Sequence, residues 1–235
     1  MHHSALVNCR YFFDTYGNFF RDLPAAPRIV DIGSQDVNGS LRGLAPEFFE
    51  YTGLDFVEGR GVDLVLEDPY HLPFDDGSVD VVLSSSCFEH SEMFWLTFLE
   101  AIRILKPSGL FYLNAPSNGS FHRYPVDCWR FYPDSGEALA KWARHNGSNT
   151  ILLESFISHQ TNEFWNDFVG IFLKDASCAD RFPNRIVSSR NDFTNGRKFG
   201  STRLINPSEL TEDQKRLASF GRTAMASRDQ KRPKA

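Results

Sequence analysis

Three carboxylates stand at the ends of successive apolar runs in the first third of the chain. Asp31, Asp55 and Asp68 each end a short run of the kind that forms buried strands. The carboxyl ends of parallel strands meet at one edge of a sheet, so these acids would lie near one crevice. There they can accept hydrogen bonds from ribose hydroxyls or from the amine of adenine. The alternative is that each acid only caps a turn.

The loop after Asp31 narrows the choice of cofactor. It begins with Gly33 and reaches Gly39, where we expect a helix to start, but Gln35 and Asp36 lie between. A dinucleotide-binding loop has the pattern Gly-x-Gly-x-x-Gly, because the middle glycine admits a pyrophosphate. Here Asp36 would repel a phosphate. The loop therefore suits a nucleoside cofactor without phosphates, which points to S-adenosylmethionine.

We expect the cofactor to contact residues at the ends of four strands. The predicted contacts are Asp31, Gly33, Ser34, Asp55, Asp68, Pro69, Tyr70, Ser84 and Ser85.

Alternating strands and helices would position these ends. Strands are predicted at 28–32, 50–55, 62–68, 79–86 and 110–115, and helices at 4–22, 91–106 and 134–146. Residues 150–157 and 163–174 indicate a final antiparallel strand pair. The predicted fold is α/β, a Rossmann-like, doubly wound, seven-stranded sheet that is mostly parallel. We assign 1–180 to this domain with its leading helix. Residues 181–235 form a basic extension with short elements at best, and 225–235 are expected to be disordered.

Further motifs carry a resemblance to a known family. Glu89-His90 follows the fourth predicted strand, and the run 103–111 reads Arg-Ile-Leu-Lys-Pro-Ser-Gly-Leu-Phe. With the loop after Asp31, these motifs resemble the class I S-adenosylmethionine-dependent methyltransferases, in the methyltransferase type 11-like subgroup. The resemblance covers residues 28–145 and departs from the family at Gln35, where a glycine is usual.

The segment 122–131, His-Arg-Tyr-Pro-Val-Asp-Cys-Trp-Arg-Phe, resembles methyltransferases of bacterial surface-glycan and secondary-metabolite pathways. This resemblance implies methyl transfer to a polar acceptor. A sugar hydroxyl, or a hydroxyl of a glycan or secondary-metabolite intermediate, is the expected target. S-Adenosylhomocysteine would be the second product.

An alcohol acceptor benefits from a base that removes its proton. His90, at a strand end before a helix, and His122, in the loop 116–132, are the two candidates, and the sequence does not choose between them. His90 could instead make a structural hydrogen bond. Glu89 is expected to brace the site. His122 and Asp127 lack a third ligand at convincing spacing, so no metal is expected.

The long loop 116–132 is the predicted acceptor-binding segment, because loops of this length in a compact domain are usually functional. Its candidate contacts are Arg123, Tyr124, Asp127, Trp129 and Arg130. An internal Asp127–Arg130 ion pair that shapes the loop is an equal alternative. The aromatic stripe of Phe94, Trp95 and Phe98 has helical spacing and is expected to fill the core.

Composition and charge limit the partners. The four cysteines are widely separated and no apolar run reaches the length of a membrane span, which predicts a cytoplasmic protein without disulfides. Residues 1–180 hold 12 basic and 25 acidic side chains, whereas 181–235 hold 13 and 5. The basic segment could pack on its own acidic domain or guide an anionic acceptor. Little aromatic interleaving there disfavours nucleic acid, and the oligomeric state is not readable.

Two other functions stay open. A degenerate protein could bind S-adenosylmethionine without turnover, with Gln35 as its support. An NAD-dependent oxidoreductase on a similar sheet is disfavoured by the missing glycine pattern and the lack of a Tyr-x-x-x-Lys pair.

Overall fold

An eight-stranded mixed sheet organises the chain. The structure is a computed structural model and describes residues 3–159 and 165–219. The sheet order is β3-β2-β1-β4-β5-β7-β6-β8. Its parallel part consists of β1 (Arg28–Ile32), β2 (Glu50–Asp55), β3 (Leu64–Val65), β4 (Val79–Ser85) and β5 (Leu105–Pro116). The inner strands β1 and β4 are apolar runs buried on both faces, as parallel strands require. The Rossmann-like, mostly parallel fold predicted from the sequence is therefore confirmed.

The antiparallel part contains the predicted strand pair and one more strand. β7 (Asp167–Leu173) pairs with β5 and with β6 (Ile151–Ser158), both antiparallel. β8 (Phe193–Lys198) then pairs with β6, so the sheet has eight strands rather than seven. The β8 sequence, Phe-Thr-Asn-Gly-Arg-Lys, lacks the alternation that identifies a strand, and its pairing depends on the long-range contact with β6.

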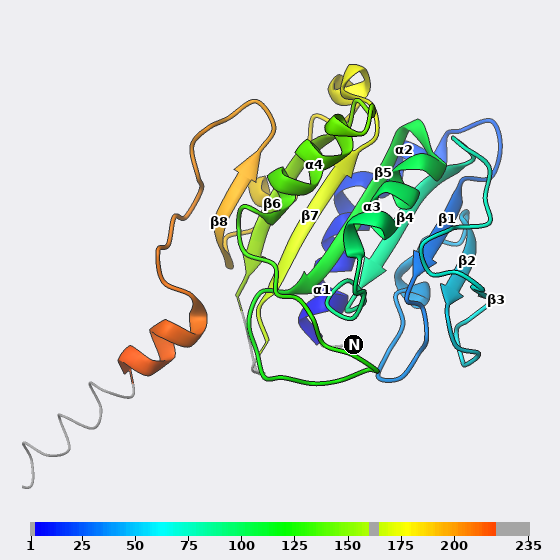
Figure 1. Cartoon of the computed structure of the whole chain (residues 1–235). Coiled ribbons are helices and arrows are strands. Elements are labelled where there is room, and N and C mark those ends of the chain that lie inside the picture. Colours follow the sequence, from blue (N-terminus) through cyan, green and yellow to red (C-terminus); the bar gives the residue numbers. More distant parts are fainter. Residues whose placement is uncertain (1–2, 160–164, 220–235) are drawn as a thin grey trace, which may run out of the picture.

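Helices cover both faces of this sheet (Figure 1). α3 (Phe94–Ile104) and α4 (Ser135–His145) lie on one face, where Phe98 packs between Phe111 and Phe172. The other face carries α1 (His3–Phe12), a π-helical turn (Phe13–Gly17) and α2 (Asn18–Arg21). There the Phe12 ring centroid is 5.2 Å from that of Tyr112 in β5. Aromatic side chains thus attach the leading helix to the sheet.

Three local predictions fail for identifiable reasons. No α-helix follows Gly39, because the Asp36 side chain accepts from Gly39 N and the Ser40 hydroxyl accepts from Arg42 N, leaving only the 3-10 turn Arg42–Leu44. β3 shrinks to two exposed residues at the sheet edge. α3 begins at Phe94, and Ser91 does not cap it.

The segment after residue 180 continues the core. The 3-10 turn Ala176–Arg181 leads into this segment, and a second 3-10 turn, Ile186–Ser188, lies within it. Ile186 and Phe193 are buried against the α1 face. Arg190 stacks on Tyr11 and donates to Asn8 in α1. These contacts accord with a basic segment that packs on its own domain. The domain division at residue 180 stays a prediction, and the disorder predicted for 225–235 lies outside the described residues. None of the described helices combines the length and apolarity that crossing a bilayer requires.

Candidate functional site

The strand order reverses between β1 and β4, at the place where doubly wound sheets bind ligands. These neighbours pair in parallel up to Ile32 and Ser84, so the loops that follow them leave side by side. We call this edge, with the loops after β1, β2, β4 and β5, the carboxyl edge. In Figure 1 the long loop after β5 runs below the strand ends and meets the loop after β1.

The first loop needs its glycine. Gly33 has φ +80°, and a Cβ on it would lie 2.6 Å from the Cβ of Cys87 in the loop after β4. Its amide and that of Ser34 both donate to the carbonyl oxygen of Leu54, at 2.9 Å. The Ser34 hydroxyl donates to the Gly61 carbonyl oxygen. Gly33 and Ser34 thus press the loop against β2 and the segment after β4.

The three strand-end acids have different surroundings. Asp55 accepts from the amides of Gln35 (3.1 Å) and Phe56 (2.8 Å), so it fixes the first loop at the carboxyl edge. Asp31 is buried and accepts from the Tyr51 hydroxyl at 2.6 Å. Burial raises the pKa of Asp31 to about 7, while the hydrogen bond from Tyr51 acts in the opposite direction. Asp68, in contrast, is exposed.

Among the other predicted cofactor contacts, the side chains of Asp68 and Ser84 make hydrogen bonds within the protein, whereas the hydroxyl of Ser85 makes none among the described residues. Asp68 accepts from the amide of Tyr70, next to Pro69, and the Tyr70 hydroxyl accepts from Met93 N at 3.3 Å. Ser84 donates to the Ile32 carbonyl oxygen at 3.0 Å and so joins β4 to β1. The hydroxyl of Ser85 is buried and has no hydrogen-bond partner among the described residues. A buried hydroxyl of this kind is a candidate for a hydrogen bond to a ligand.

The two candidate bases lie together. The rings of His90 and His122 are edge to face, with centroids 4.9 Å apart. Nδ1 of His90 lies against the carbonyl oxygen of Val126, which can only accept, so Nδ1 carries a proton. Burial lowers the pKa of His90, which keeps its ring neutral with Nε2 unprotonated. His122 is more exposed, and its Nδ1 is 3.5 Å from Asp127.

Asp127 is the electrostatic centre of the loop. Its buried carboxylate accepts two hydrogen bonds from Arg130, at 2.6 and 2.9 Å, and one from the His122 amide at 2.7 Å. The hydrogen bonds from Arg130 lower the pKa of Asp127 to about 2. Asp127 is therefore charged at neutral pH. The ion pair proposed as one alternative for these two residues is present and shapes the loop.

Glu89 lies beneath the histidines. It is buried, and burial raises its pKa to about 8, which favours the protonated form. Its Oε1 is 3.7 Å from Nε2 of His90, and its Oε2 has no partner among the described residues. Single ligand atoms of Glu89, His90 and His122 lie within 4.8 Å of one another, so this trio could hold a metal ion. The sequence did not predict this grouping.

The acceptor loop is tied to the first loop by a contact that the sequence did not predict. The Tyr124 hydroxyl donates to Oε1 of Gln35 at 3.1 Å across the carboxyl edge. Arg123 turns back to the Pro125 carbonyl oxygen. Gln35, which stands where the family usually has a glycine, therefore anchors the acceptor loop. This unusual residue was the feature of the sequence that could have indicated the contact. The sequence also did not predict the position of Trp165, whose ring meets that of His122 edge to face with centroids 4.8 Å apart.

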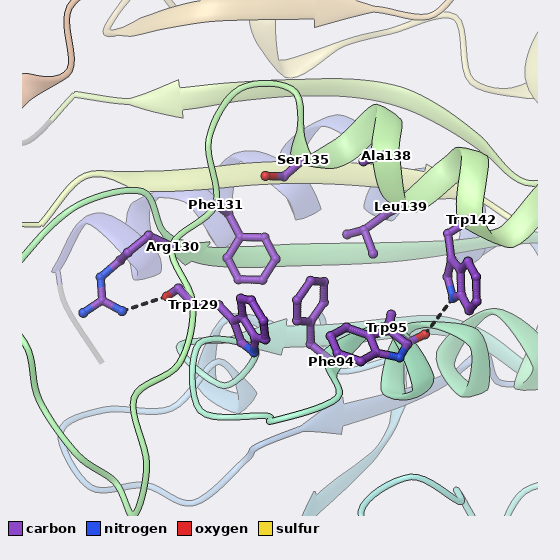
Figure 2. A pocket seen from close by; sticks show the side chains of 9 residues that line it. All are labelled: Phe94, Trp95, Trp129, Arg130, Phe131, Ser135, Ala138, Leu139 and Trp142. Atoms are coloured by element: carbon purple, nitrogen blue, oxygen red, sulfur yellow. Dashed lines mark hydrogen bonds between the residues drawn. The ribbon is translucent and has the colours of Figure 1, made fainter.

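A pocket opens between α3, α4 and the end of the same loop (Figure 2). It has a volume of about 540 Å³ and is lined by Phe94, Trp95, Trp129, Arg130, Phe131, Ser135, Ala138, Leu139 and Trp142. The sequence predicted Trp129 and Arg130 as ligand contacts. Phe98 of the aromatic stripe is fully buried as expected. Phe94 and Trp95 instead line the pocket, because helical spacing does not reveal a gap between two helices.

Comparisons with known proteins agree with this geometry. Residues 34–113 match the family model of a methyltransferase domain. Over 92 residues the chain is 35% identical to a phthiotriol/phenolphthiotriol dimycocerosates methyltransferase of Mycobacterium tuberculosis, covering 33% of each chain. The chain thus spans about a third of the length of the curated relatives it matches.

Solved structures share the fold at low identity. The Burkholderia thailandensis 1,6-didemethyltoxoflavin-N1-methyltransferase, with bound S-adenosylhomocysteine, has a TM-score of 0.54 at 14% identity, covering 73% of this chain and 79% of that one. A putative sarcosine dimethylglycine methyltransferase from Galdieria sulphuraria has a TM-score of 0.52 at 14% identity, covering 72% and 86%.

Proposed function

We propose that this chain, which belongs to the class I S-adenosylmethionine-dependent methyltransferases by the match of residues 34–113 and by its fold, methylates a hydroxyl group of a small-molecule or glycan acceptor. One observation carries the choice of a hydroxyl. The loop after β5 places His122 and Asp127 beside His90 and is bonded through Tyr124 to the first loop of the carboxyl edge. A base is thereby held at the edge where the cofactor binds.

The carboxyl edge fits S-adenosylmethionine. Gly33 keeps the first loop free of side-chain bulk, and Asp55 is positioned by three amides with an oxygen lone pair left for a ribose hydroxyl. The unpartnered hydroxyl of Ser85 is a further polar group for the ligand. When bound, the cofactor supplies a methyl group already activated by its sulfonium, so the protein has only to orient the acceptor, exclude water and remove a proton.

We assign the base to His122. As the acceptor oxygen gains the methyl group, its proton passes to Nε2 of His122. The imidazolium formed lies 3.5 Å from the charged carboxylate of Asp127, which stabilises it. Burial lowers the pKa of His90, which disfavours the charged form of that ring. His90 would position the His122 ring through their edge-to-face contact.

Methyl-transfer kinetics of two alanine variants test this assignment. We would screen glycosides and hydroxylated metabolites by release of S-adenosylhomocysteine and then compare His122→Ala with His90→Ala. His122→Ala should lower kcat by about 10²–10⁴-fold, the usual contribution of a general base. Its affinity for S-adenosylhomocysteine should stay within a few-fold of wild type. Full activity of His122→Ala would refute the assignment, and transfer only to nitrogen or carbon acceptors would refute O-methylation.

A further inference from the structure

The pocket between α3 and α4 is lined by three of the four tryptophans of the chain. Trp95 comes from α3, Trp142 from α4 and Trp129 from the end of the acceptor loop, and all three surround the pocket in Figure 2. We call it the tryptophan pocket. Its volume of about 540 Å³ lies in the range of small-molecule sites, roughly 300–1,000 Å³.

The walls of this pocket are apolar and held in place. The indole N–H of Trp129 donates to the Ser91 carbonyl oxygen at 3.0 Å, and that of Trp142 donates to the Trp95 carbonyl oxygen at 3.3 Å. Both polar ends are therefore bonded within the protein, and the ring surfaces remain for a ligand. Phe94 packs edge-on against both Trp95 and Trp129, with ring centroids 5.3 Å from each. The shape of the pocket is thus formed before any ligand arrives.

Few polar groups line the pocket. Arg130 and Ser135 are the polar lining residues, and Arg130 already donates two hydrogen bonds to Asp127. A sugar ring has a hydroxyl on most carbons, and each buried hydroxyl needs a hydrogen-bond partner. The lining cannot supply so many partners. Hydrocarbon fits these walls better than a sugar does.

The tryptophan pocket adjoins the groups assigned to the acceptor. A second hollow of about 280 Å³ is lined by Gly119, Phe121, Asp127, Cys128, Trp129 and Arg130. Trp129 and Arg130 line both hollows, so these two side chains form the wall between them. On one side of this wall Asp127 faces His122, and on the other the aromatic rings face the pocket.

We propose that the tryptophan pocket binds an alkyl or aryl portion of the acceptor, so that the methyl acceptor is an amphipathic hydroxylated molecule rather than a free sugar. This inference rests on the proposed methyl transfer and adds the substrate class. The polar end of the acceptor lies at His122 and Asp127, and its hydrocarbon end lies among the tryptophans. Arg130, at the boundary, separates the two ends.

The test uses β-D-glucosides that differ only in the aglycone. Methyl, hexyl, octyl and phenyl β-D-glucoside would be titrated into the full chain by calorimetry, each below its critical micelle concentration and with S-adenosylhomocysteine present. Tryptophan fluorescence would follow the same titrations. Each methylene that leaves water strengthens binding by roughly four-fold, so octyl should bind at least about 100-fold more tightly than methyl glucoside. The phenyl glucoside separates aryl from alkyl preference.

Two substitutions on α4 locate the binding. Ala138 is exposed and lines the pocket, so Ala138→Phe fills it without disturbing the core. Lys141 is exposed on the same helix and does not line the pocket, so Lys141→Phe adds a ring elsewhere. Ala138→Phe should weaken octyl glucoside binding at least about ten-fold, whereas Lys141→Phe should leave it unchanged.

Several outcomes would overturn the proposal. One is equal affinity for methyl and octyl glucoside, and another is an equal loss of octyl glucoside affinity in both α4 variants. A third is a dimer, detected by light scattering, that Ala138→Phe dissociates, because the pocket would then be a contact between subunits. Binding of S-adenosylhomocysteine is measured in the same samples. If it binds and the chain-length dependence is absent, the pocket proposal fails while the methyltransferase function stands. If only the glucosides bind, the function fails and the pocket remains a hydrocarbon site.

Discussion

Replacing Asp127 by asparagine tests whether its ion pair with Arg130 organises the acceptor loop. The Asp127 carboxylate is buried and accepts two hydrogen bonds from Arg130 and one from the His122 amide. Asp127→Asn keeps the shape of this side chain and removes its negative charge. Breaking a buried pair costs about 3–5 kcal/mol. Because the Arg130 side chain is 20% exposed and water can reach it, we expect a loss of about 2–3 kcal/mol in the free energy of unfolding.

A second acid provides the matched control. Asp134 also pairs with an arginine, Arg197, but its side chain is 87% exposed. Since exposed pairs contribute at most about 1 kcal/mol, Asp134→Asn should cost at most that much. Urea unfolding followed by circular dichroism would compare both variants with wild type.

The stabilisation contributed by the Asp127 carboxylate should depend on pH. Its pKa falls from an ordinary 3.8 to about 2 in the folded chain, so its stabilisation is full well above pH 4 and is lost as the pH falls toward 2. The stability difference between wild type and Asp127→Asn should therefore shrink between pH 5 and pH 2. A cost no larger than that of Asp134→Asn, or a difference that does not change with pH, would show that the ion pair does not stabilise the loop.

Three further predictions concern the carboxyl edge. Asp55→Ala should weaken S-adenosylmethionine binding by about 1–3 kcal/mol, measured by calorimetry, because buried ribose hydroxyls lose their acceptor; unchanged affinity would place the ribose elsewhere. Tyr124→Phe removes the bond to Gln35, and tryptic cleavage after Arg123 should become up to about five-fold faster, since such a bond contributes about 1 kcal/mol; equal cleavage rates would show that the contact does not hold the loop. Dialysis against EDTA before the assay should leave methyl-transfer activity unchanged. If the activity is lost and added Zn²⁺ or Mn²⁺ restores it, Glu89 and the two histidines would be assigned as metal ligands.

The sequence predicts the parallel strands well, for a local reason. Runs such as Arg28–Ile32 and Val79–Ser85 are apolar and bounded by turn residues, so a short window identifies them. β8 could not be found this way, because Phe193–Lys198 is polar and pairs with β6 across a long stretch of sequence. The helix expected after Gly39 failed because side chains of Asp36 and Ser40 bond to the backbone instead.

In the candidate site too, local contacts could be predicted from the sequence and long-range contacts could not. The spacing of Asp127 and Arg130 indicated an ion pair, which is present. The contact between His90 and His122, and the one between Tyr124 and Gln35, join segments far apart in the chain, so no local pattern contains them. The tryptophan pocket could not be predicted from the sequence. The periodicity of Phe94 and Trp95 identifies the apolar face of a helix, but it does not show which element packs against that face or whether a gap remains.

Calorimetric titration with S-adenosylmethionine, S-adenosylhomocysteine and NAD would test which cofactor the carboxyl edge binds. We expect micromolar binding of the first two ligands, because the arrangement of Asp55, Gly33 and Ser85 at the carboxyl edge fits a nucleoside. We expect no heat with NAD, because the loop after β1 has Gln35 and Asp36 in place of the middle glycine that admits a pyrophosphate. Binding of NAD, or silence with both sulfur-containing ligands, would contradict the proposed methyltransferase function.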